Sequence, residues 1–248
     1  IRQAASARFN AMDDTAQARL VNTIVSGLPG ANDSWTLNDV LALLELYKNI
    51  DTSQLRANLV DFLAEVVPVA EEHDMRMCCH QDDPPFSLLG LPRVMSSTED
   101  YAAILTAIDS PANGATLCTG SLGVNPTFDV VDFIDRLGDR IHFVHLRNTL
   151  RQGTTDGDKL SFHEAMHLEG NTDMVIAIRA LLKEEARRKA EGRSDWEIPM
   201  RPDHGQDILD DLGRRSQPGY PTIGRMKGLA ELRGVMTALA HPAAAKGA

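Results

Sequence analysis

The chain has 248 residues, 43% hydrophobic and 24% charged, which is the composition of a globular protein with one sizeable core. Its formal net charge of -10 would repel a polyanion, so nucleic acid is not expected as a partner. No apolar run reaches the ~20 residues that span a bilayer, so no membrane partner is expected either. The three cysteines, two of them adjacent, are a poor disulfide framework and predict a reducing, cytoplasmic location.

The first fifty residues predict helices and turns and no strand. Apolar side chains at helical spacing predict a helix over residues 16–26, which ends at Gly27-Leu28-Pro29-Gly30. A second helix is expected over residues 37–48, where Thr36 is followed three positions later by an acidic residue and so serves as its cap. A third helix is predicted over residues 53–73 from its apolar face.

From residue 75 onward, short apolar runs alternate with helical stretches. This alternation is typical of βαβ units and a parallel sheet. The strands are predicted at 75–80, 115–118, 141–146 and 198–203, and the helices at 98–109, 128–137, 173–189 and 222–239. The segments that leave each strand are long and rich in Gly, Pro and polar residues, as in (β/α) barrels, where these loops build the active site.

We therefore predict an α/β fold, namely the C-terminal part of a (β/α)8 TIM barrel. About four of the eight strands are visible, together with a helical N-terminal stretch. The expected domains are a helical insertion or lead-in segment at 1–50 and the C-terminal half of a TIM-barrel catalytic domain at 51–248. Four strands cannot close such a barrel, so an upstream part of the same polypeptide is expected to supply the others.

Each predicted strand ends in a residue that can bind a metal ion. These residues are His80, Cys118, His145 and Asp203. Because the carboxyl ends of parallel strands lie on one rim, the four side chains can converge on one site. Imidazole, thiolate and carboxylate together suit a divalent ion such as Fe²⁺, Mn²⁺, Co²⁺ or Zn²⁺. His142 falls on the opposite strand face from His145 and is predicted to pack beneath the helices.

Polar residues beside these ligands are candidates for substrate binding and catalysis. Arg147 and Arg201 each lie two positions from a ligand and share its strand face. Each guanidinium could hold a substrate carboxylate, or it could neutralise a carboxylate of the barrel; the sequence leaves both open. His204 directly follows a ligand, and Gly205 lets the chain turn there, which would bring the imidazole over the site. Tyr220 lies in a turn and alone means little.

The segment His163-Glu164-Ala165-Met166-His167 matches the HExxH pattern of zinc metalloproteases. That pattern requires a helix that places both histidines on one face, with the glutamate as base. Here Gly170 follows closely, and the segment lies inside a long strand-to-helix loop, which disfavours the protease interpretation. We expect His163 or His167 to reach the rim site as a substrate contact instead.

With these residues assembled, the chain resembles the C-terminal two-thirds of the mannonate dehydratases. The matching stretches occur in order along nearly the whole chain. They are Ser26-Gly27-Leu28-Pro29-Gly30, His80-Gln81-Asp82-Asp83-Pro84-Pro85, Leu89-Gly90-Leu91-Pro92-Arg93, Cys118-Thr119-Gly120-Ser121, His145-Leu146-Arg147, Phe162-His163-Glu164-Ala165, Met200-Arg201-Pro202-Asp203-His204-Gly205 and Pro218-Gly219-Tyr220. The family usually has Pro after the first histidine ligand, where this chain has Gln81; we expect this departure to alter the loop and not the chemistry.

The resemblance implies a TIM barrel related to the xylose isomerases. It also implies a hydro-lyase that dehydrates D-mannonate to 2-dehydro-3-deoxy-D-gluconate in hexuronate (glucuronate) breakdown. Mn²⁺ or Fe²⁺ would occupy the four ligands, with His204 and Tyr220 as the catalytic pair, their acid and base roles unassigned. Two other classes stay open: a metal-dependent sugar isomerase of the same fold, and a non-enzymatic module stabilised by metal with closed coordination. A homo-oligomer is compatible with each of these readings.

Overall fold

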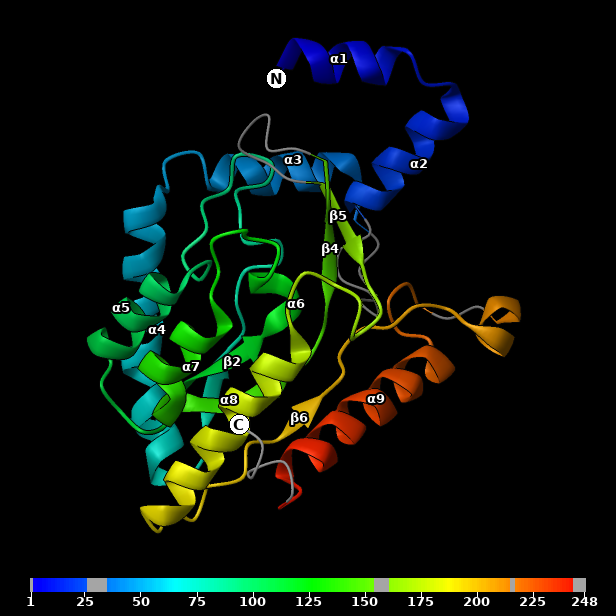
Figure 1. Cartoon of the computed structure of the whole chain (residues 1–248). Coiled ribbons are helices and arrows are strands. Elements are labelled where there is room, and N and C mark those ends of the chain that lie inside the picture. The colour runs from blue at the N-terminus through cyan, green and yellow to red at the C-terminus, as the bar shows by residue number, and fades with distance from the viewer. Residues whose placement is uncertain (1, 26–34, 154–160, 215–216, 243–248) are drawn as a thin grey trace. The chain divides into compact units, whose positions relative to one another are not determined.

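The computed structural model describes residues 2–25, 35–153, 161–214 and 217–242 (Figure 1). Its contacts divide the chain into two compact units, Ile1–Ile50 and Asp51–Ala248. The turn predicted at residues 27–30, and with it the matching stretch at residues 26–30, lies outside the described residues.

Helices make up the described part of the first unit. They are α1 (Arg2–Asn10), α2 (Asp14–Val25) and α3 (Leu37–Leu46). The sequence pattern indicated α2 and α3 but not α1, whose few apolar residues form no continuous stripe. At the start of α3 the Thr36 hydroxyl accepts a hydrogen bond from the backbone N–H of Asp39. The Asp39 carboxylate in turn accepts one from the backbone N–H of Thr36, which completes the predicted cap.

A four-stranded parallel sheet lies at the centre of the second unit. Its strands are β1 (Met77–Cys79), β2 (Asn113–Cys118), β3 (Ile141–His145) and β6 (Met200–Arg201), and they pair in the order β1-β2-β3-β6. Each strand overlaps one of the four predicted runs. Strand order therefore follows chain order, as in a barrel, whereas a doubly wound sheet reverses direction at a switch point.

Helices connect and cover the strands. They are α4 (Thr52–Glu72), α5 (Thr98–Ala107), α6 (Thr119–Leu122), α7 (Val130–Leu137), α8 (Met174–Ala190) and α9 (Thr222–Ala240), with 3-10 turns η1 (Gly138–Arg140) and η2 (Leu209–Gly213). The long helices α4, α5, α7, α8 and α9 share one buried apolar cluster with the sheet. In that cluster Leu117 of β2 and Val144 of β3 are register neighbours. Because side chains alternate along a strand, the next pair, Cys118 and His145, faces away from the helices.

Between β3 and α8 the chain forms an antiparallel hairpin that the sequence pattern did not predict. Its strands are β4 (Thr149–Gln152) and β5 (Ser161–Glu164). These strands are short and polar, so their periodicity is weak and the segment was interpreted as a loop. His163 and Glu164 therefore lie on a strand, which excludes the helical arrangement that a zinc metalloprotease requires.

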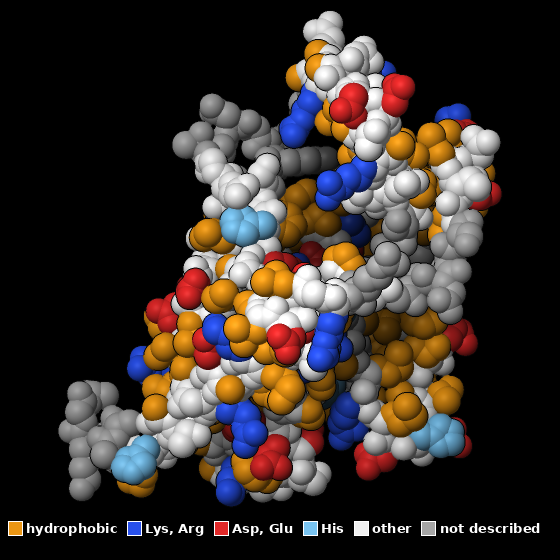
Figure 2. Space-filling model, turned by 90° about the vertical axis from the view of Figure 1, so that its right-hand side faces the viewer, with side chains coloured by type: hydrophobic (Ala, Val, Ile, Leu, Met, Phe, Trp, Pro, Cys, Tyr) orange, Lys and Arg blue, Asp and Glu red, His pale blue; other side chains and the backbone are white. Residues whose placement is uncertain are grey.

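The surface combines apolar and charged side chains, as Figure 2 shows for one face. In the second unit, Leu209, Leu212 and Met226 are 74%, 75% and 66% exposed. Within the described residues, no helix combines the length and the apolar character needed to cross a membrane. In the part of the chain that the structure describes, the outer strands β1 and β6 each pair with one neighbouring strand only, so both edges of the parallel sheet are open. Such a sheet is about half of a (β/α)8 barrel.

Candidate metal centre

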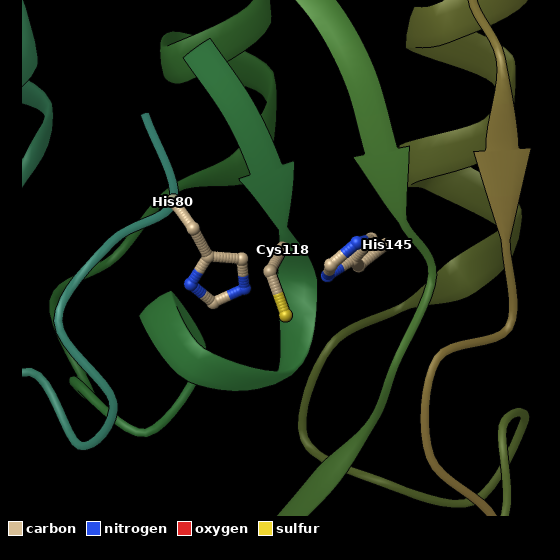
Figure 3. A group of neighbouring side chains, drawn as sticks. All are labelled: His80, Cys118 and His145. Atoms are coloured by element: carbon tan, nitrogen blue, oxygen red, sulfur yellow. The ribbon is translucent and has the colours of Figure 1, made fainter. Parts of the chain in front are cut away.

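Three predicted ligands meet at the carboxyl ends of three neighbouring strands (Figure 3). His80 directly follows β1, Cys118 is the last residue of β2, and His145 is the last residue of β3. Their ligand atoms all lie within 4.8 Å of one another, and the two imidazole rings are 5.0 Å apart between centroids. His80 is exposed, whereas Cys118 and His145 are buried. A cation could therefore reach the group from the His80 side and be enclosed by the other two.

The state of the buried ligands fits a metal ion. The Nδ1 atom of His145 is buried and has no hydrogen-bond partner among the described residues, a rare situation that calls for an explanation such as a bound ion. Burial lowers the pKa of His145 to about 4, so its imidazole is neutral and can donate a lone pair. Burial raises the pKa of Cys118 to about 11, and a cation at the sulfur would reverse this by stabilising the thiolate.

The fourth predicted ligand, Asp203, lies beside this group but outside the 4.8 Å cluster. One of its oxygens, Oδ2, is 3.5 Å from Nδ1 of His145, while Oδ1 accepts a hydrogen bond of 2.5 Å from Arg201. Burial raises the pKa of Asp203, but the neighbouring His145, His204 and Arg201 outweigh burial, and the net shift of the pKa is downward. Asp203 also has φ +63°, a backbone conformation that is uncommon outside glycine and that concentrates at functional sites.

The predicted catalytic pair is in direct contact. The Nε2 atom of His204 lies 3.1 Å from the Tyr220 hydroxyl, and the two rings are 4.8 Å apart. The loop that carries Tyr220 is tied back to the end of β6, because the backbone N–H of Gly205 donates to the carbonyl of Gly219. Gly219 has φ +83°, which favours glycine at this turn. Two residues that are sixteen positions apart in the sequence are thus brought into contact.

The two candidate arginines differ in how fully they are paired. Arg147 is buried, and its guanidinium donates to Glu164 at 2.7 Å, to Asp83 at 2.5 Å and to the Ser121 hydroxyl at 3.2 Å. Of the two roles left open by the sequence, this arrangement corresponds to neutralising carboxylates of the protein. Arg201 is bonded to Asp203 and its side chain is 42% exposed, so it retains surface on which a substrate can bind.

The histidines of the HExxH segment are not members of the ligand group that the described residues form. His163 is exposed on β5, and strand alternation directs it to the opposite face from Glu164. His167 is buried, with its Nε2 atom 2.9 Å from the carbonyl oxygen of Pro202. Glu164 is the residue of this segment that joins the site, through Arg147 and through His204 at 2.8 Å. The sequence signals for it were its place in the HExxH pattern and in the matching stretch Phe162-His163-Glu164-Ala165.

A parallel sheet in chain order, with candidate metal ligands at its carboxyl edge, defines the chain as part of a (β/α)-barrel protein. Residues 4–246 match the model of the D-mannonate dehydratase (UxuA) family, and the chain belongs to this family. It is 57% identical to mannonate dehydratase 1 of Agrobacterium fabrum, over 96% of this chain and 58% of that protein. It is 53% identical to the mannonate dehydratase of Rhizobium meliloti, over 97% and 59% respectively. The chain thus spans less than two-thirds of the length of these curated relatives.

Solved structures confirm the fold. The crystal structure of mannonate dehydratase from Streptococcus suis matches with a TM-score of 0.69 at 32% identity, over 86% of this chain and 55% of that one. A xylose isomerase-like TIM barrel protein from Mycobacterium smegmatis matches with a TM-score of 0.50 at 15% identity, over 75% and 52%. The predicted relationship to xylose isomerase-like barrels is therefore confirmed at the level of fold.

Proposed function

We propose that this chain carries the metal centre and the catalytic pair of a hydro-lyase that converts D-mannonate to 2-dehydro-3-deoxy-D-gluconate in hexuronate (glucuronate) catabolism. The observation that carries the proposal is the position of the His204–Tyr220 pair beside Asp203, which borders the His80, Cys118 and His145 group. Membership of the D-mannonate dehydratase family and identities of 57% and 53% to curated mannonate dehydratases support it.

The proposed cofactor is one Mn²⁺ or Fe²⁺ ion, held by His80, Cys118, His145 and Asp203. The mixed nitrogen, sulfur and oxygen donors suit a divalent ion of this kind. When bound, such an ion would stabilise the negative charge that develops on the substrate as its C2 proton leaves. The Oδ2 atom of Asp203, 3.5 Å from Nδ1 of His145, would complete the set as the fourth ligand.

The chain's own groups supply the proton transfers. Dehydration breaks the C2–H and C3–O bonds, releases water and leaves an enol that tautomerises to the 2-keto acid. One member of the His204–Tyr220 pair takes the C2 proton, and the other protonates the departing C3 hydroxyl. Of the two arginines proposed as substrate contacts, Arg201 is better placed for the substrate carboxylate, because the donors of Arg147 are engaged by Asp83, Glu164 and Ser121.

A cytoplasmic location accompanies this proposal. All three cysteines are free thiols, in keeping with a reducing compartment. A homo-oligomer remains compatible with the proposal.

Metal analysis combined with product analysis tests the proposed function. The natural polypeptide that contains residues 1–248 is loaded with Mn²⁺ or Fe²⁺ and supplied with D-mannonate, and a chelated sample serves as control. We expect about one bound ion per site, formation of a 2-keto-3-deoxy acid and no product after chelation. If the product were instead an isomeric sugar acid, formed without loss of water, the protein would be a sugar isomerase and not a dehydratase. Bound metal with no binding of sugar acid would indicate a metal-stabilised module.

A further inference from the structure

Glu164 links the buried Arg147 to His204 of the predicted catalytic pair. Its Oε1 atom accepts a hydrogen bond from Nε of Arg147 at 2.7 Å and lies 2.8 Å from Nδ1 of His204. The other nitrogen of His204, Nε2, faces the hydroxyl of Tyr220. Arg147, Glu164, His204 and Tyr220 therefore form a continuous hydrogen-bonded chain from a buried guanidinium to a phenol.

The backbone of Glu164 is held on two sides. On one side Glu164 pairs with Thr149 across the hairpin, and the next residue, Ala165, donates its N–H to the carbonyl of Asn148 at 3.0 Å. On the other side the Gln206 side chain donates to the carbonyl of Glu164 at 2.7 Å. Because Gln206 lies two residues after His204, the same loop holds both partners of the carboxylate–imidazole contact. The hairpin thus fixes the carboxylate relative to the imidazole.

The contact with a carboxylate determines which nitrogen of His204 carries the proton. Burial raises the pKa of Glu164, but hydrogen bonds from His204 and Arg147 outweigh it and keep the group ionised. An ionised carboxylate only accepts hydrogen bonds, so Nδ1 of His204 must be the donor. In the neutral imidazole, Nε2 then has the free lone pair and can accept from the Tyr220 hydroxyl.

We propose that Glu164 is a positioning residue that holds His204 in its Nδ1–H tautomer, with Nε2 directed at Tyr220, while Arg147 anchors the carboxylate. This inference rests on the proposed function for its catalytic consequence, but the tautomer itself is a property of the folded chain. It also gives the HExxH segment a role, because its glutamate orients a histidine on another loop.

A buried glutamate elsewhere in the fold provides a matched control. Glu184 of α8 accepts hydrogen bonds from Arg187 at 2.7 Å and from Arg188 at 2.9 Å, and its side chain is 7% exposed. Its carboxylate is therefore an arginine-paired carboxylate like that of Glu164, but it has no histidine partner among its described contacts. Glu184→Gln reports the cost of disturbing such an ion pair without touching the catalytic pair.

The experiment compares Glu164→Gln, Glu184→Gln and the unaltered protein by steady-state kinetics, metal content, thermal unfolding and ¹⁵N NMR of the histidine rings. For Glu164→Gln we expect a fall in kcat of about 10- to 100-fold, the usual cost of losing an orienting partner. We also expect a change in KM and in metal content of less than about twofold, and loss of the pure Nδ1–H signature of His204. Glu184→Gln should lower Tm and leave kcat and the His204 signature unchanged.

The outcomes separate this inference from the proposed function. An active protein whose His204 signature and kcat are unchanged in Glu164→Gln would overturn the positioning role and leave the dehydratase proposal intact. A protein inactive on mannonate that nevertheless shows the Nδ1–H tautomer, and loses it in Glu164→Gln, would support the positioning role and count against the dehydratase. If Glu164→Gln lowered kcat, metal content and Tm together while His204 kept its Nδ1–H tautomer, the role of Glu164 would be limited to a structural ion pair with Arg147.

Discussion

The Nδ1 atom of His145 lies 3.5 Å from Oδ2 of Asp203, and this distance separates two residues that leave neighbouring strands. The nitrogen makes no hydrogen bond within the described part of the chain, although it is buried. An unpaired buried nitrogen beside a carboxylate, with a thiol and a second imidazole nearby, is the arrangement that a divalent cation would complete. Asp203 has φ +63°, and its backbone is held by Arg225, whose Nε donates to the Asp203 carbonyl oxygen at 2.8 Å.

The first prediction concerns the sulfur ligand. Cys118→Ser replaces a potential thiolate with a hydroxyl that stays protonated, so metal affinity should fall by more than the about 10- to 100-fold typical of losing an outer-shell partner. Metal content after dialysis and turnover should both drop. Cys78→Ser, on the strand that precedes His80, is the control and should retain its metal. Full occupancy and an unaltered rate in Cys118→Ser would remove Cys118 from the ligand set.

The second prediction concerns the phenol of Tyr220. Tyr220→Phe keeps the ring that stacks edge-on against His204 but removes the hydroxyl 3.1 Å from Nε2. We expect kcat to fall by about 10²- to 10⁴-fold, the usual contribution of a general acid or base. Metal content and Tm should stay unchanged. Tyr47→Phe, at an exposed position in the first unit, is the control. A kcat within about threefold of the original would exclude Tyr220 from proton transfer.

The third prediction separates the two roles of Arg147. Arg147→Lys keeps the charge but loses the planar fork that contacts Glu164, Asp83 and Ser121 together. Because the guanidinium is buried, we expect the free energy of unfolding to fall by about 1–3 kcal/mol, since some of its partners lose their hydrogen bonds. We also expect a lower kcat with little change in KM. If KM instead rose about tenfold with Tm unchanged, Arg147 would be a substrate-carboxylate contact.

The strand ends, and with them the candidate ligands, could be predicted from the sequence because both depend on local patterns. A short apolar run followed by a loop residue defines the end of a strand, and parallel strands align such ends. The sequence therefore predicted that His80, Cys118, His145 and Asp203 converge; the structure groups the first three, with Asp203 beside them. The roles of His204 and Tyr220 as a catalytic pair were implied by the family resemblance alone, because no local rule relates the two loops, and their contact was not predicted.

Long-range pairing could not be predicted in the same way. Asp83 lies 64 positions from Arg147 in the sequence, and Glu164 lies 40 positions from His204. No periodicity relates residues so far apart. The β4–β5 hairpin that brings Glu164 to the site has too little apolar character to be distinguished from a loop. For the same reason the sequence could not show that His163 and Glu164 lie on opposite faces of β5; the role of His163 as a substrate contact stays a prediction.

A fourth prediction concerns acid sensitivity. Burial lowers the pKa of His142 to about 4, whereas an unfolded histidine titrates near ~6.5. The folded state therefore binds a proton at His142 less readily than the unfolded state does. Neutral His142 contributes its full share to the free energy of unfolding above about pH 6.5, and this contribution is lost as the pH falls toward 4. His142→Gln can still donate to the Pro111 carbonyl, which Nε2 contacts at 2.9 Å. Its Tm should decline less between about pH 7 and 4.5. His145, whose pKa is also lowered, contributes equally in the unaltered protein and in His142→Gln, so the difference between their slopes of Tm against pH reports His142. Equal slopes would contradict the prediction.

The last prediction concerns the packing beneath the buried arginine. A Cβ atom at Gly120 would lie 2.4 Å from Cγ and 2.6 Å from Cδ of Arg147. Arg147 cannot move away without breaking its bonds to Asp83 and Glu164, so Gly120→Ala should destabilise the protein by about 1–3 kcal/mol, as overpacking does. It should also lower kcat, because displacement of Arg147 disturbs the Glu164–His204 contact.

The control is Gly234→Ala in α9, where the added atom meets nothing within 4 Å. That change should raise stability by up to about 1 kcal/mol, from helix propensity. Denaturant unfolding and kinetics on both variants provide the measurement. If Gly120→Ala were as stable and as active as Gly234→Ala, Arg147 would not be held as rigidly as its contacts indicate.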